Sequence, residues 1–122
     1  MLACVCLASL SVNAQATIAD ARNFAIGQTV TIKGVVTNGS ELGPIRYIQD
    51  ATGALPAYGT NLNGVVRGDS ITATGVLFDF SGLLEISPTN SFVNHGPASG
   101  LPTPLQLPLS AINETKEAQL VR

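Results

Sequence analysis

The sequence predicts an all-β fold: a small closed barrel of five short strands. Two stretches carry this prediction, because each reads as a strand with a glycine in its middle. Residues 29–37 read TVTIKGVVT and residues 70–78 read SITATGVLF, so Gly34 and Gly75 occupy matching places. A glycine inside a strand is typical of a bulge or a sharp bend. Two bent strands with a tight hairpin between them favour a closed barrel over a flat sheet.

Length and composition restrict both the core and the function. The chain has 122 residues, enough for one domain with tails. Hydrophobic residues make up 45% of it and aromatic residues 5%, with no Trp, so the core must be built from aliphatic side chains. Charged residues make up 11%, against roughly 25% in ordinary soluble domains. The net charge of −2, from 6 Lys and Arg and 8 Asp and Glu, disfavours tight binding of nucleic-acid phosphates.

Residues 1–16 have the pattern of a signal peptide. The apolar run LACVCLASL at residues 2–10 is too short for a stable membrane span, and Ala14-Gln15-Ala16 supplies a small-x-small cleavage site. We therefore expect export to a secreted, extracellular or periplasmic location. Cleavage after Ala16 would remove both cysteines and with them any disulfide scaffold or thiolate metal site. Because no basic leader precedes the run, a buried amino-terminal strand or helix is the alternative.

A short helix is expected directly after the cleavage site. Thr17 and Asp20 fit a capping box, in which the Thr17 side chain accepts from the backbone three residues on. Apolar residues at positions 18, 21 and 24 or 25 share one face, and Gly27 ends the helix. We expect this helix to plug or bracket one end of the barrel.

Alternating apolar and polar residues, bounded by turn residues, indicate the strands. We expect five, at residues 29–37, 45–50, 54–58, 70–78 and 83–87. Asp50 to Gly53 forms the turn between the second and third strands, because Asp50 can accept from the backbone ahead of it. Pro56 in the third strand requires a position that donates no ladder hydrogen bond. Residues 78–82, FDFSG, form the loop of the last hairpin.

The rest of the chain is expected to be an irregular, Pro-rich tail, because prolines recur from Pro88 onward. We divide the chain into a signal peptide at 1–16, a barrel domain at 17–95 and a Pro-rich linker at 96–122. The apolar pair Leu120-Val121 begins what looks like a further element. We therefore expect the sequence to be one module of a longer protein.

Three segments carry a resemblance to a known family: VTIKGVV at 30–36, YIQDATG at 47–53 and RGDSITATG at 67–75. They resemble the OB-type domains of secreted bacterial multidomain proteins, notably of Bacteroidetes. The resemblance covers roughly residues 17–87. It implies a five-stranded Greek-key OB-fold barrel. Such domains often lie beside other extracellular domains, including nuclease or phosphoesterase domains.

The resemblance also implies a ligand site across the second and third strands, between the loops that join strands one to two and four to five. On this sequence the candidate ligand-binding residues are Lys33, Asn38, Arg46, Tyr47, Gln49, Tyr58 and Phe80. Aromatic side chains of this kind stack on bases, while Arg and Lys hold the nucleic-acid backbone. Each candidate has a structural alternative: the tyrosines as half-buried strand residues, Phe80 with Phe78 as a cap of the barrel mouth, and Arg46 as a rim residue.

The sequence offers little for catalysis, and we expect no enzyme activity, no cofactor and no metal. His95 is the sole histidine, and no Gly-x-Ser-x-Gly motif occurs. His, Asp and Glu do not cluster at ligand spacing. Asp79 and Glu85 flank the last hairpin, where carboxylates are usually solvated.

These observations predict a non-enzymatic, secreted OB-fold binding module. The first hypothesis for its partner is single-stranded nucleic acid, bound weakly across the second and third strands. The alternative is a structural module, or one that contacts proteins or glycans, within a larger secreted protein. The acidic balance of the chain favours the alternative.

Overall fold

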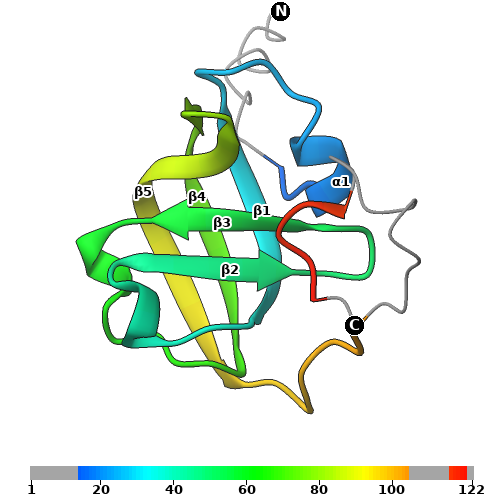
Figure 1. Ribbon diagram of the computed structural model, residues 1–122, viewed down its shortest axis with the longest axis vertical. Coiled ribbons are helices and arrows are strands. Elements are labelled where there is room, and N and C mark those ends of the chain that lie inside the picture. Colours follow the sequence, from blue (N-terminus) through cyan, green and yellow to red (C-terminus); the bar gives the residue numbers. More distant parts are fainter. Residues whose placement is uncertain (1–13, 105–115, 121–122) are drawn as a thin grey trace, which may run out of the picture.

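Five strands close into a barrel in the order β1-β2-β3-β5-β4 (Figure 1). The structure is a computed structural model and describes residues 14–104 and 116–120. Its elements are α1 (Ile18–Ala21), β1 (Thr29–Val36), η2 (Ser40–Leu42), β2 (Ile45–Gln49), β3 (Ala54–Tyr58), η3 (Thr60–Leu62), β4 (Asp69–Phe80) and β5 (Leu83–Pro97). This strand order, with β3 and β5 parallel and the other pairs antiparallel, is that of an OB-fold. The predicted fold class is confirmed.

β1 changes partners at Gly34. Residues 29–35 pair with β4 in an unbroken register, and Val35 and Val36 pair with Gln49 and Ile48 of β2. An added Cβ on Gly34 would lie 2.5 Å from the carbonyl oxygen of Gln49. Glycine is therefore required here because the β2 backbone passes so close, which is how one bent strand serves two neighbours.

β5 is much longer than predicted, since it runs from Leu83 to Pro97 and not to residue 87. The prolines do not end the strand. Pro88 lies at an irregularity of the β4–β5 register, between the pairs Leu77↔Ile86 and Gly75↔Thr89, where no ladder hydrogen bond is needed from it. A Cβ on Gly75 would overlap the carbonyl oxygen of Pro88, so Gly75 makes the irregularity possible. The irregular tail therefore begins about ten residues later than the prolines suggested.

Two plugs close the ends of the barrel. α1 is a single turn capped by Thr17, whose hydroxyl accepts from the Asp20 amide at 3.2 Å, as predicted. It buries Ile18 and Ala21 beside the β2–β3 turn, on the right of Figure 1. At the opposite end of β2, η3 buries Leu62 and the segment after η3 buries Val65. Aliphatic strand residues fill the space between the plugs: Val30, Ile32, Val36, Ile48, Leu55, Ile71, Leu77 and Ile86.

The predicted signal peptide lies outside the described residues except for its last three positions. There Gln15 forms a parallel bridge with Thr31, and the Ala16 amide donates to the Thr31 carbonyl at 2.9 Å. Residues 105–115 and 121–122 of the predicted linker also lie outside the described part. Across residues 14–104 and 116–120, no helix has the length and apolar character that a membrane span requires.

Candidate functional site

A groove on the outer surface of the barrel joins the end of β3, the start of β2 and the β4–β5 hairpin. Its volume is about 480 Å³, within the usual range for ligand pockets. We call it the aromatic groove. Its lining residues are Ile45, Tyr58, Phe78, Phe80, Leu83, Glu85 and Ser87.

Strand register brings these side chains together. Phe78 pairs with Glu85 and Phe80 pairs with Leu83 across the β4–β5 hairpin. Because strand side chains alternate between faces, these residues point outward while Leu77 and Ile86 are buried in the core. On the neighbouring hairpin, Ile45 pairs with Tyr58.

A tight turn at Ser81 and Gly82 sets the position of the two phenylalanines. Both residues have positive φ angles, 52° and 99°, as a two-residue hairpin turn with the right-handed strand twist requires. The Asp79 carboxylate accepts from the Gly82 amide at 2.7 Å and stabilises the turn. Asp79 therefore serves the turn and lies on the other face of β4 from Phe78 and Phe80.

Three of the chain's six aromatic residues are exposed in the groove. Tyr58 is 45% exposed, Phe78 42% and Phe80 59%. Single exposed apolar residues are normal on a protein surface, whereas adjacent ones that line one hollow mark an interaction site.

Glu85 is the one carboxylate in the groove, and it is 5% exposed. Burial raises the pKa of this carboxyl group above its ordinary value. Within residues 14–104 and 116–120 its side chain has no hydrogen bond or ion pair. The groove therefore combines a largely buried acid, whose carboxylate oxygens still reach solvent, with three exposed aromatic rings.

Arg46, one of the predicted ligand-binding residues, is fully buried. Its guanidinium donates to four backbone carbonyls: Gly43 at 2.6 Å, Ile45 at 2.9 Å, Val65 at 2.9 Å and Asn63 at 3.2 Å. These contacts tie the β1–β2 loop to the plug after η3. Its charge serves the fold and does not reach the surface.

Two other predicted residues also make internal contacts. The Asn38 side chain accepts from the Tyr47 amide at 2.7 Å and donates to the Ile45 carbonyl at 3.0 Å, so it continues the edge of β2. Gln49 is 4% exposed and accepts from the Leu120 amide at 2.9 Å. Both side chains are thus occupied by backbone groups of this chain.

The remaining four predicted residues are divided between the groove and other surfaces. Tyr58 and Phe80 line the aromatic groove. Tyr47 is half-buried, and Lys33 is exposed on β1 opposite Thr72; neither lines the groove. Phe78 and Glu85 complete the site, and the alternation of residues 83, 85 and 87 opposite 80 and 78 across a short turn could have located them from the sequence.

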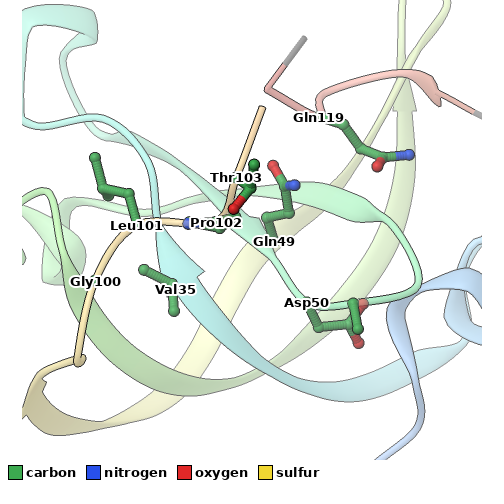
Figure 2. A pocket seen from close by; sticks show the side chains of 9 residues that line it. Val35, Gln49, Asp50, Gly100, Leu101, Pro102, Thr103 and Gln119 are labelled. Carbon is green, nitrogen blue, oxygen red and sulfur yellow. The ribbon is translucent and has the colours of Figure 1, made fainter. Parts of the chain in front are cut away.

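A second hollow, of about 350 Å³, lies where the carboxy-terminal segment crosses the end of β2 (Figure 2). Figure 2 shows Leu101 and Thr103 of the carboxy-terminal segment near Val35 and Gln49 of the barrel, with Thr103 beside Gln49. The segment at 116–120 is held there by an ion pair between Glu117 and Arg22 at 2.6 Å. This chain's own tail thus occupies part of the surface on which the sequence placed the ligand.

Residues with catalytic potential lie apart from one another. His95 shares a hydrogen bond of 2.8 Å with the Thr72 hydroxyl on the surface of β4. In the part of the chain that the structure describes, His, Asp and Glu do not gather in groups of three that would hold a metal ion.

Asp50 accepts from the amides of Thr52 and Gly53 in its turn, as predicted, and also from the Ile18 amide at the start of α1.

Comparison with known proteins supports the fold. No known protein family matches the sequence, and no curated protein matches it either. Among solved structures, the chain is similar to the hypothetical protein ygiW from E. coli, with a TM-score of 0.54 at 16% identity over 69% of this chain and 90% of that one. Asparaginyl-tRNA synthetase from Pyrococcus horikoshii gives a TM-score of 0.49 at 21% identity over 65% of this chain and 22% of that one. The similarity to ygiW and the strand order together show an OB-type barrel.

Proposed function

We propose that this chain is a non-enzymatic binding module that takes its ligand in the aromatic groove. One observation carries the proposal: Tyr58 at the end of β3 and Phe78 and Phe80 at the end of β4 are exposed around one hollow. Buried aromatic anchors dominate the energetics of protein interfaces. A ligand that covered these rings would remove a continuous apolar surface from water.

The ligand that best fits is a segment of another polypeptide. The walls of the groove are apolar, and its single ionisable acid, Glu85, would repel a phosphate. Apolar and aromatic walls with one charged group are typical of sites that grip side chains. This favours a protein-interaction module.

Single-stranded nucleic acid is the second candidate, because three exposed rings suit base stacking at about 1–3 kcal/mol per base. The cations that such a ligand needs lie elsewhere. Arg46 donates to backbone carbonyls, and Lys33 and Arg67 are exposed but do not line the groove. Nucleic acid is therefore ranked below polypeptide.

The setting that we propose is a module of a larger exported protein. The apolar run at residues 2–10 and the small residues around position 15 support export. The low charge content and the OB-type pattern agree with the secreted bacterial modules that the sequence resembles.

The proposal is tested with a displayed library of random peptides, from which those that bind the full chain are selected. Enriched peptides would be titrated against the wild type, the double variant Tyr58→Ala/Phe80→Ala and the control Phe24→Ala, which removes an exposed ring outside the groove. We expect the double variant to bind at least about tenfold more weakly, since two anchors are lost. The control should bind as the wild type does.

A labelled oligothymidine, measured by fluorescence anisotropy at low and physiological salt, ranks the two candidates. Weak or no binding agrees with the polypeptide proposal. Saturable, salt-sensitive binding that the double variant loses would make single-stranded nucleic acid the ligand. Selected peptides that bind the double variant as tightly as the wild type would contradict the groove as the site.

A further inference from the structure

Glu85 occupies an unusual position, because its carboxylate has no partner of its own. The side chain is 5% exposed, and the residues that share the groove with it are apolar or aromatic apart from Ser87. Within the described ranges, 14–104 and 116–120, the carboxylate forms no hydrogen bond or ion pair, and its oxygens are not among the buried atoms. Largely buried carboxylates in proteins are normally paired, so one that is unpaired inside the chain and open to a hollow points to a partner from outside the chain.

The walls around Glu85 are suited to the same kind of partner. Phe78 is its cross-strand neighbour, and Phe80 and Tyr58 line the rest of the hollow. The faces of aromatic rings carry negative potential and attract ammonium and guanidinium groups. Aromatic rings beside a carboxylate therefore favour an organic cation over a neutral or anionic group.

The apolar residues of the groove indicate which kind of ligand would carry the cationic group. Ile45 and Leu83 lie in the same groove, where they can pack against a hydrocarbon chain. Lys and Arg have this combination, an aliphatic stem that packs on apolar surface and a charged head. A bare metal ion would need several oxygen ligands, and in the residues that the structure describes Glu85 belongs to no such group.

We propose that the aromatic groove recognises a Lys or Arg side chain of a partner polypeptide, with Glu85 as its counter-ion and Tyr58, Phe78 and Phe80 around its charged head. This inference rests on the proposed function and adds the chemistry of the ligand. It also explains why an acid is tolerated in an apolar hollow: the acid is paired in the complex. The raised pKa of Glu85 in the unbound chain agrees with this, since burial without a partner disfavours the charged form.

The test uses two peptides that differ only in charge. The probe is Ac-Ala-Leu-Lys-Leu-Ala-NH2, and its neutral match carries norleucine in place of the lysine. Each is titrated against the full chain while the amide chemical shifts are followed by NMR at neutral pH. We expect the lysine peptide to shift groove amides and to bind about tenfold more tightly than the norleucine peptide.

Two variants separate the contributions. Glu85→Gln keeps the shape of the side chain and should abolish the preference for lysine. Asp79→Asn removes the same charge from the same hairpin on its other face and should keep the preference, because Asn can still accept from the Gly82 amide. A preference that survives Glu85→Gln would overturn the inference.

The remaining outcomes distinguish the inference from the proposed function. If both peptides bind equally and Tyr58→Ala/Phe80→Ala weakens both, the groove binds polypeptide and the inference about the cation is wrong. If neither peptide shifts the groove amides, the cation inference is overturned, and the library peptides decide separately whether the groove binds at all. If Asp79→Asn and Glu85→Gln reduce lysine binding equally, the attraction comes from overall charge, which also contradicts the inference.

Discussion

Two buried residues of charged type, Arg46 and Glu85, differ in how their side chains are paired. Arg46 has its charge satisfied by four carbonyls from two stretches of the chain, residues 43–45 and 63–65, which makes it part of the fold. Glu85 has its charge unsatisfied within the described chain, which makes it part of a site. The sequence suggested Arg46 as a ligand-binding residue because it does not show the four carbonyls that Arg46 donates to. These belong to residues 43, 45, 63 and 65, which only the folded chain brings together.

The pH dependence of stability tests the environment of Glu85. Burial raises its pKa in the folded chain above the ordinary value of 4.5 that it has when unfolded. The folded state therefore favours the protonated acid, and that contribution is fully present below the unfolded pKa and is lost as pH rises through the folded one. We expect Glu85→Gln and the wild type to have similar free energies of unfolding below pH about 4, and the variant to be the more stable at neutral pH.

Urea unfolding over a series of pH values measures this difference. The informative quantity is variant minus wild type at each pH, because other carboxylates contribute equally to both proteins. If the wild type became more stable relative to the variant as pH rose, the carboxylate would have a stabilising partner in the free chain. The cation inference would then lose its basis.

At the scale of elements, the β4–β5 hairpin supplies most of the site. Five of the seven groove residues lie on it, and its long register depends on the contact between Gly75 and Pro88. Alternation in the sequence predicted most of β4 and the start of β5. It placed residues 78–82 in the hairpin loop, whereas β4 runs to Phe80 and the turn is formed by Ser81 and Gly82. The length of β5 could not be predicted, because whether a proline ends a strand depends on the partner strand, and here Gly75 makes room for it.

Gly75→Ala tests this contact. An added Cβ would overlap the Pro88 carbonyl and the Ile86 side chain, so one strand must shift. We expect a loss of about 2–3 kcal/mol in the free energy of unfolding, measured by urea denaturation. Gly64→Ala is the matched control, because a Cβ there meets nothing within 4 Å; it should change stability by less than about 1 kcal/mol. Equal losses in both variants would show that the Gly75 contact is not special.

At the scale of the whole molecule, the pattern of strands and turns in the sequence was enough to predict the fold but not to locate the site. Glycine-broken strands and the tight turn from Asp50 to Gly53 predict an OB-type barrel, and the strand order confirms it. The usual OB ligand surface predicted a site on the second and third strands. Here the carboxy-terminal segment crosses the Gln49 end of β2, and the exposed aromatic residues gather instead where β3 meets the β4–β5 hairpin. The crossing of β2 by the carboxy-terminal segment leaves no local sign in a single sequence, whereas the alternation across the β4–β5 turn does indicate which residues of that hairpin share a face.

We expect ligands to bind in the aromatic groove and not in the hollow beneath the carboxy-terminal segment. Amide shifts mapped by NMR, while a library-selected peptide is titrated into the full chain, distinguish the two sites. We expect the shifts to concentrate at Ile45, Tyr58 and residues 78–87, and Phe24→Ala to leave them unchanged. Shifts concentrated instead at Val35, Gln49 and residues 100–103, with the groove amides unmoved, would contradict this expectation.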